Sequence, residues 1–162
     1  MLQWDKLYSM QYELDTFIER EKKLGEESLV AKKIVALLVE VGELANETRC
    51  FKFWSDKGPS ERSVILEEYV DGIHFLLSLG LETNLRYSSN HNEQPITNLT
   101  EQFQKLFGCI HRFAEHPSQS NYDQMWDVYL CLGESLEFSE MDIMNAYLEK
   151  NEVNVNRQKE GY

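Results

Sequence analysis

Cysteine, proline, basic residues and long apolar runs are all scarce in this chain of 162 residues. The three cysteines, Cys50, Cys109 and Cys131, are widely spaced and form no CxxC pair, which indicates reduced, mostly structural thiols in a cytoplasmic protein. Three prolines and eight glycines argue against long disorder. No apolar run approaches the roughly 20 residues of a membrane span, and no N-terminal apolar segment resembles a signal peptide. We therefore expect a cytoplasmic protein that does not bind a membrane.

The charge is strongly negative, because 16 Lys and Arg face 28 Asp and Glu, giving a net charge of −12. This balance argues against a nucleic-acid polymer as partner and suits a protein that binds cations. An acidic protein can still bind a nucleotide if a metal and a few local Lys or Arg residues offset the phosphates. The length indicates one domain, 1–162, which buries about 70% of its unfolded surface.

The hydrophobic pattern predicts an all-α protein, a bundle of about six helices, since no segment shows sustained period-2 alternation. Gly25 marks a break, and Ser28, Ser60 and Ser139 are the predicted N-caps, the last in a capping box with Asp142. The stretch 86–95 is polar and predicts a surface loop. The expected helices cover about residues 5–20, 28–49, 61–85, 99–114, 122–137 and 140–155.

Two pairs of carboxylates are spaced three residues apart, Glu40 with Glu43 and Glu68 with Asp71. On a helix this spacing puts both acids of a pair on one face. One such pair is typical of a solvated helix face, and several arise by chance in so acidic a chain. Two pairs on adjacent, largely apolar helices would instead direct four carboxylates into one cleft, where close acids repel by about 4 kcal/mol per pair. Oxygen ligands favour a hard cation, and a few carboxylates with a phosphate substrate suit Mg²⁺.

Other segments allow two interpretations each. The unbroken apolar run 34–39 predicts that its helix is buried on all sides. Gln11 is either a surface residue or part of an apolar neighbourhood, and Trp54 either fills the core or stacks on a base. The C-terminal segment 150–162 is either a frayed, charged tail or a phosphate-binding lid, in which Lys150, Asn154 and Arg157 follow helical spacing.

Taken together, these motifs resemble the dimeric, all-α dUTPases, members of the all-α NTP pyrophosphohydrolases with the MazG proteins as relatives. The resemblance rests on Gln11 with its preceding methionine, both acidic motifs, Trp54 and the tail. It spans most of the chain, but the region 86–138 carries no motif that contributes to it.

The resemblance implies a role for each matching residue. Glu40, Glu43, Glu68 and Asp71 would bind Mg²⁺ in a four-helix core, with Glu67 as a neighbouring acid, and Glu40 would orient or deprotonate the attacking water. The remaining assignments place the uracil beside Gln11, Trp54 and His74, the deoxyribose or metal beside Asn46, and the phosphates and sugar beside Lys150, Asn154 and Arg157.

The activity implied is Mg²⁺-dependent hydrolysis of dUTP to dUMP and pyrophosphate by a homodimer. A related enzyme acting on dCTP or a modified nucleotide is the alternative within the same chemistry. An alternative of another class is a catalytically idle helical scaffold that binds a regulatory protein. The residues leave open whether water attacks the α or the β phosphorus, and the resemblance favours β. The aromatic residues that serve either the core or the dimer interface are Tyr122, Trp126, Tyr129 and Phe138.

Overall fold

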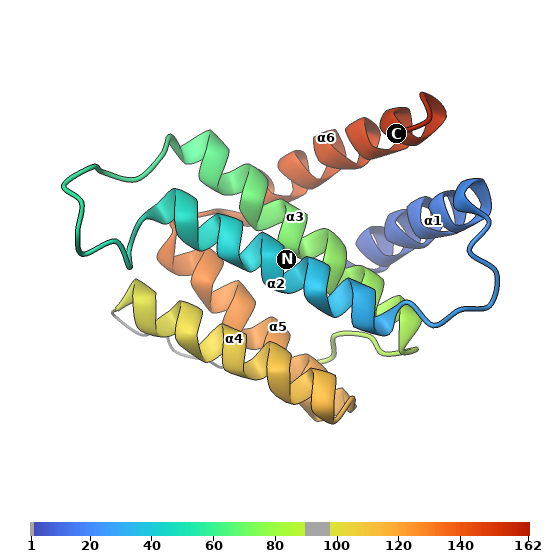
Figure 1. Ribbon diagram of the computed structural model, residues 1–162, viewed down its shortest axis with the longest axis horizontal. Helices are drawn as coiled ribbons and strands as arrows, with labels where there is room; N and C mark the ends of the chain where they lie inside the picture. Colours follow the sequence, from blue (N-terminus) through green and yellow to red (C-terminus); the bar gives the residue numbers. More distant parts are fainter. Residues whose placement is uncertain (1, 90–97) are drawn as a thin grey trace.

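The computed structural model describes residues 2–89 and 98–162, and these residues form six helices without a strand (Figure 1). The predicted all-α class is therefore confirmed. None of the described helices is both long and apolar enough to cross a membrane. The helices are α1 (Trp4–Lys22), α2 (Val30–Thr48), α3 (Arg62–Glu82), α4 (Leu99–Glu115), α5 (Gln119–Ser135) and α6 (Glu140–Lys159).

Helix α3 is the central helix of the bundle, because α1, α2, α5 and α6 all pack against it. Apolar residues occur on every side of α3, and Val70, Leu76, Leu77 and Leu79 are completely buried. A helix that is apolar all round is stable only when it is surrounded by protein. Two polar residues of α3, His74 and Ser78, are therefore buried as well.

A reciprocal pair of tyrosines fixes α3 against α5. The Tyr129 hydroxyl donates to the carbonyl oxygen of Tyr69 at 2.6 Å, and the Tyr69 hydroxyl donates to that of Tyr129 at 3.1 Å. Each ring lies over a glycine of the opposite helix. A Cβ atom at Gly72 would lie 2.0 Å from the Tyr129 hydroxyl, and one at Gly133 would lie 2.3 Å from the Tyr69 hydroxyl. Only glycine permits this close approach.

The four aromatic residues assigned in the sequence to core or interface all belong to the core. Tyr122, Trp126 and Tyr129 are fully buried, and Phe138 is 7% exposed. Tyr122 repeats the contact just described about two turns further along α3, because its hydroxyl donates to the carbonyl oxygen of Leu76 at 2.8 Å. These side chains hold α5 to α3 within one chain.

The helix starts follow the sequence in one case and depart from it in another. The capping box of Ser139 and Asp142 is confirmed at the start of α6. The predicted cap at Ser28 is wrong, because α2 begins at Val30 with Leu29 at the N-cap position. There the backbone N–H of Leu29 donates to the Glu82 carboxylate at 2.9 Å. The acceptor therefore comes from the far end of α3, which no local pattern reveals.

The predicted cap at Ser60 is also wrong. Helix α3 has Glu61 at its N-cap position, without a side-chain cap. Ser60 instead binds back to α2: its backbone N–H donates to the carbonyl oxygen of Glu47 at 2.9 Å, and its hydroxyl donates to the Glu47 carboxylate. Ser60 thus holds the connector against α2.

Helix α5 begins earlier, and helix α6 ends later, than the sequence predicted. Helix α5 begins at Gln119, capped by the Ser118 hydroxyl, which accepts from the Asn121 N–H. Helix α6 continues past the predicted end near residue 155 to Lys159. Basic residues in a last turn interact favourably with the helix dipole, and Lys159 stands there. Residues 86–89 are non-helical as predicted, and the rest of the predicted loop lies outside the described residues.

One side of α2 is not buried, contrary to prediction. Val35 is 59% exposed and Val39 is 51% exposed. They are four residues apart, so they share a helix face. Helix α2 packs on α3 and α4, and within the described residues this face meets no other helix. The apolar run therefore supplies two surfaces, of which residues 2–89 and 98–162 cover one.

Candidate functional site

Three carboxylates from two helices meet beside the centre of the bundle. Glu40 of α2 and Glu68 and Asp71 of α3 each offer an oxygen atom, and these atoms lie within 4.8 Å of one another. Glu43 is exposed one turn beyond Glu40 and acts on the charges of both Glu40 and Glu68. The structure therefore brings three of the four predicted ligands into one cluster and leaves Glu43 at its edge.

The carboxylates of this cluster repel one another, and the pKa values of two of them are raised. Burial, and after it the negative charges of the neighbouring Asp71, Glu43 and Glu68, together raise the pKa of Glu40 to about 7. Burial and the negative charges of Asp71 and Glu43 likewise raise the pKa of Glu68 to about 7. Neighbouring carboxylates disfavour each other's ionisation. Near pH 7 the cluster therefore takes up either protons or a cation.

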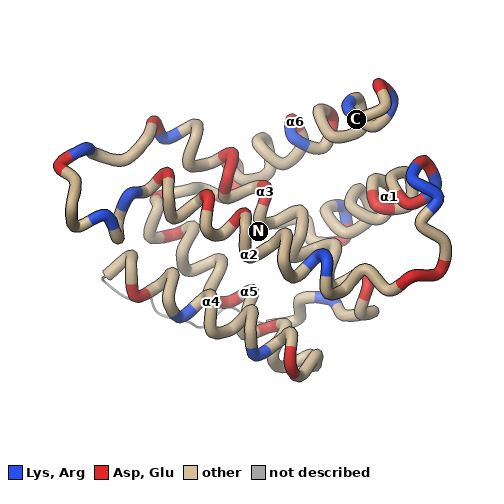
Figure 2. Tube along the Cα trace, in the orientation of Figure 1, with Lys and Arg blue, Asp and Glu red and all other residues tan. Residues whose placement is uncertain are grey.

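A lysine from the C-terminal helix supplies one positive charge. The Lys150 ammonium lies 2.7 Å from Asp71 and 2.9 Å from Glu67, both on α3. Burial lowers the pKa of Lys150, but these two carboxylates outweigh it and raise the pKa. Figure 2 shows acidic residues along α2 and α3, and basic residues towards the end of α6. Lys150, the first residue of the tail, thus brings a positive charge to the edge of the carboxylate cluster.

A pocket of about 340 Å³ opens beside the carboxylates, between α1, α3 and α6. Glu40 and Asp71 lie in its wall. Five residues that the sequence assigned to substrate binding also line it, namely Gln11, His74, Lys150, Asn154 and Arg157. Residues from opposite ends of the chain therefore share one cavity with the metal-ligand candidates.

His74 is buried in this pocket with one nitrogen in use. Its Nδ1 lies 2.8 Å from Gln11 Oε1, which also accepts from the Tyr147 hydroxyl at 3.0 Å. The Tyr147 ring stacks on the imidazole with centroids 4.2 Å apart. Burial, and then the positive charge of Lys150, lowers the pKa of His74 to about 3. The imidazole is therefore neutral at pH 7.

The contact of Nδ1 with an oxygen acceptor sets the tautomer of this neutral ring. An amide oxygen accepts and cannot donate, so Nδ1 of His74 carries the proton. Nε2 is then an acceptor, and it is buried without a hydrogen-bond partner among the described residues. A buried polar atom without a partner costs about 1–3 kcal/mol. His74 therefore carries one fixed, unpaired acceptor that is shielded from solvent in this structure.

Two predicted residues do not line the pocket. Asn46 is exposed on α2. Trp54 is 62% exposed in the connector after α2, where it packs edge-on against Phe51 and Phe53. The interpretation of Trp54 as a core residue is therefore wrong. The assignment of Asn46 and Trp54 to substrate binding stays a prediction.

Sequence reasoning missed three residues that organise the pocket, Asp15, Ser78 and Tyr147. Each lies on a helix face that had already been identified, because Asp15 is four residues after Gln11, Ser78 is four after His74 and Tyr147 is three before Lys150. Helical spacing around the predicted residues could have found them.

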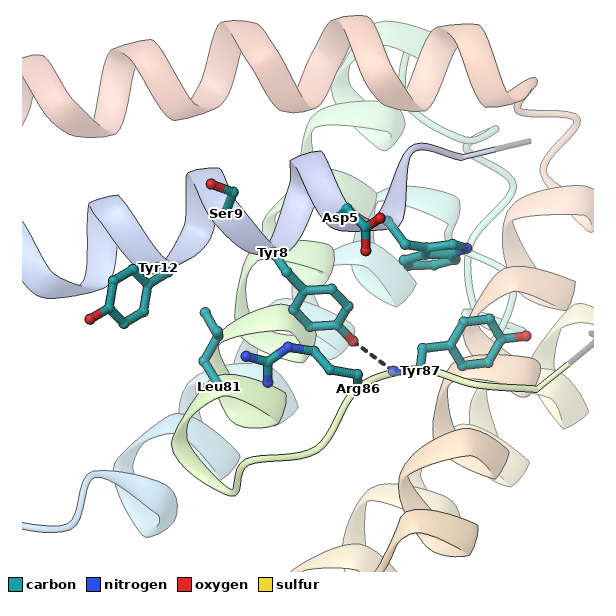
Figure 3. Close-up of a pocket in the computed structure, with 8 residues that line it drawn as sticks. Asp5, Tyr8, Ser9, Tyr12, Leu81, Arg86 and Tyr87 are labelled. Atoms are coloured by element: carbon teal, nitrogen blue, oxygen red, sulfur yellow. Dashed lines mark hydrogen bonds between the residues drawn. The ribbon is translucent and has the colours of Figure 1, made fainter.

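A second pocket lies on another side of α1, lined by residues of α1, the end of α3 and the segment that follows (Figure 3). Two of its polar side chains, Tyr8 and Arg86, are engaged within the protein. The Tyr8 hydroxyl accepts from the backbone N–H of Tyr87 at 3.0 Å and contacts the Tyr122 hydroxyl at 2.9 Å. The Arg86 guanidinium lies over the Tyr8 ring and donates to two backbone carbonyl oxygens. These contacts of Tyr8 and Arg86 hold α1 against the segment after α3.

A comparison with known protein families places the chain in one of them. No curated protein matches the chain. A family model described as dUTPase matches residues 3–162, almost the entire length. This match includes both acidic helices, the pocket and the tail, and it agrees with the resemblance seen in the motifs. The chain belongs to the dUTPase family, the enzymes that hydrolyse dUTP.

Proposed function

We propose that this dUTPase converts dUTP to dUMP and pyrophosphate in a Mg²⁺-dependent reaction, with the pocket between α1, α3 and α6 as its active site. The observation that carries the proposal is the meeting of two unlike features in one cavity. The carboxylates of Glu40 and Asp71 suit the cation of a metal–triphosphate, and the buried Nε2 of His74 suits a base.

The donor set suits magnesium in particular. Glu40, Glu68 and Asp71 offer only oxygen atoms, which favour hard cations, and Mg²⁺ commonly takes a few carboxylates together with substrate phosphates. The raised pKa values of Glu40 and Glu68 mean that a divalent cation would relieve repulsion there. When bound, Mg²⁺ neutralises charge on the phosphates. Glu43, at the edge of the cluster, would complete the set, and Glu40 would orient the attacking water.

The phosphates would be held from the side of α6. Lys150, Asn154 and Arg157 line the pocket at intervals of four and three residues, so they share one helix face. Arginine offers a planar fork of donors and lysine a point charge, and both suit phosphate oxygens. Lys150 already lies between Asp71 and Glu67. A metal there would compete with Lys150 and free it for the phosphates.

The base would be selected at His74. Uracil carries a hydrogen on N3, and cytosine carries a lone pair there. A fixed acceptor at Nε2 accepts a hydrogen bond from N3–H of uracil. In cytosine, the lone pair on N3 would instead face the lone pair on Nε2, and the two would repel. A site built for one hydrogen bond rejects an analogue that lacks it by about 10⁴-fold. Because Nε2 is shielded from solvent, the base would reach it only after the side chains that cover it move. Opening of a lid formed by residues 150–162 would be one such movement.

The enzyme would be a homodimer through the uncovered face of α2. Val35 and Val39 are exposed there. A groove of about 500 Å³ between α2 and α4, lined by Gly42, Phe103 and Phe107 among others, opens on α2 as well. Exposed apolar surface of this kind marks protein–protein contacts. A second copy of the chain would cover the valines and the groove together.

The experiment is a panel of dUTP, dCTP, dTTP and UTP, with the products separated by chromatography and Mg²⁺ titrated against EDTA. We expect dUMP and pyrophosphate from dUTP, little turnover of dCTP, and no activity in EDTA. Formation of dUDP and phosphate, or equal rates in EDTA, would contradict the proposal. Preference for dCTP would favour the alternative substrate, and no turnover at all would favour the scaffold.

A further inference from the structure

Asp15 lies in the wall of the pocket and binds Gln11, the residue that contacts His74. Its carboxylate accepts from Gln11 Nε2 at 2.8 Å and from the Ser78 hydroxyl at 2.6 Å. The Lys33 ammonium lies 3.8 Å away, on α2. Asp15 is thus fixed from three helices, α1, α3 and α2.

Lys33 is itself anchored, which keeps this arrangement in place. Its side chain is 11% exposed, and its ammonium binds the Glu82 carboxylate at 2.8 Å. The other oxygen of Glu82 accepts from the N–H of Leu29 at the start of α2. The Asp15 carboxylate therefore faces the Lys33 ammonium, which is held in place by Glu82.

This carboxylate decides which way the Gln11 amide points. A carboxylate oxygen 2.8 Å from the amide accepts a hydrogen bond, so the amide nitrogen faces Asp15. The amide oxygen then faces His74 and Tyr147, and both donate to it. With the amide reversed, two oxygens would be in contact at Asp15. The tautomer of His74 follows from this one constraint.

We propose that Asp15 is a positioning residue for base selection: through Gln11 it holds His74 as the Nδ1–H tautomer, so that the pocket accepts a ring with an N–H donor, as in uracil. The inference rests on the proposed function for the identity of the base. The tautomer itself depends only on the contacts of Asp15, Gln11 and His74.

An asparagine at position 15 removes the constraint while keeping the shape. Its amide can donate, so the Gln11 amide is free to reverse and present its nitrogen to His74. The single imidazole proton then moves to Nε2, which becomes a donor. A donor there matches the lone pair on N3 of cytosine. Asp15→Asn therefore weakens the discrimination between the two bases.

The first measurement is ¹⁵N NMR of histidine-labelled protein, without nucleotide or metal, with the signal of His74 assigned by its loss in His74→Asn. We expect a protonated Nδ1 and an unprotonated Nε2 in the unaltered protein, and a reversed or mixed pattern in Asp15→Asn. The double variant Gln11→Glu with Asp15→Asn exchanges donor and acceptor and should restore the original pattern. Glu13→Gln, the same loss of charge on an exposed residue of α1, should leave it unchanged.

The second measurement is the ratio of kcat/KM for dUTP to that for dCTP. We expect Asp15→Asn to lower the ratio at least about tenfold, as for one buried hydrogen bond, and the double variant to recover part of it. An Nε2–H tautomer in the unaltered protein overturns the proposal even if no variant folds. The same tautomer and ratio in Asp15→Asn also overturn it. If the tautomer depends on Asp15 but dUTP is not hydrolysed, the positioning stands and the proposed function fails.

Discussion

Replacing Glu40 with glutamine tests the strained carboxylate cluster without touching its shape. Two unit charges within 4.8 Å repel by about 3.5 kcal/mol at an effective dielectric of about 20. The largest of the charges that oppose ionisation of Glu40 is Asp71, although Lys150 offsets part of the Asp71 charge. Glu40 and Asp71 are both half-buried, and solvent screening reduces the repulsion further. We therefore expect Glu40→Gln to stabilise the metal-free protein by about 1 kcal/mol, or about 2–4 °C in Tm.

The stabilisation expected for Glu40→Gln depends on pH, and the raised pKa of Glu40 gives the direction of that dependence. Folding raises the pKa of Glu40 from 4.5 to about 7. Below pH 4.5 the group is protonated in both states, and its contribution to stability is fully present. That contribution is lost as the pH rises through about 7, because the unfolded chain releases the proton more easily. The difference in Tm between variant and unaltered protein should be small at pH 4.5 and largest near pH 8.

The assay is thermal unfolding in EDTA across this range, with Glu152→Gln, an exposed acid of α6, as the control. Adding Mg²⁺ should reverse the order of the two Tm values, because a bound ligand stabilises the folded state and Glu40 is a proposed ligand. If the unaltered protein is the more stable at pH 8 in EDTA, the carboxylates are not strained and the reasoning is refuted.

Three further predictions concern activity, assembly and the lid. Glu43→Gln and Asp71→Asn should each lower the rate by about two orders of magnitude or more while the circular dichroism stays native, and near-native turnover at saturating Mg²⁺ would contradict the metal site. Val39→Glu should convert a homodimer into a monomer of 19.1 kDa in light scattering, and a 19.1 kDa mass before substitution would exclude the dimer. Arg157→Ala should cut the rate strongly and Lys150→Ala more mildly, and hydrogen exchange in the last turns of α6 should slow with a non-hydrolysable dUTP analogue and Mg²⁺; unchanged exchange would exclude lid closure.

Local patterns in the sequence were enough to predict the helices and the acidic faces. The spacing of Glu68 and Asp71 on an apolar helix, and the capping box at Ser139, depend on residues a few positions apart, so helical geometry alone relates them. The exposed Val35 and Val39 were misjudged because an apolar run does not say how many neighbours a helix has. That number is a property of the whole bundle.

The parts of the site that depend on contacts between distant residues could not be predicted. Gln11 meets His74 across 63 positions and Tyr147 across 136 positions. Only the packing of α1, α3 and α6 creates these contacts. The same is true of Glu82, whose carboxylate replaces the predicted Ser28 cap. The sequence suggested the residues of the pocket, and packing decides which of their atoms meet.

The reciprocal tyrosines of α3 and α5 determine which wall of the proposed active site can move. Gly72, where the Tyr129 hydroxyl comes closest to α3, stands between Asp71 and His74. A hydroxyl that donates to one particular carbonyl oxygen allows α3 neither to turn nor to slide without losing that bond. The Asp71 carboxylate and the His74 imidazole are thus held at a fixed position and orientation relative to α5. Any adjustment to a nucleotide would then come from α6, which would move relative to the fixed α3.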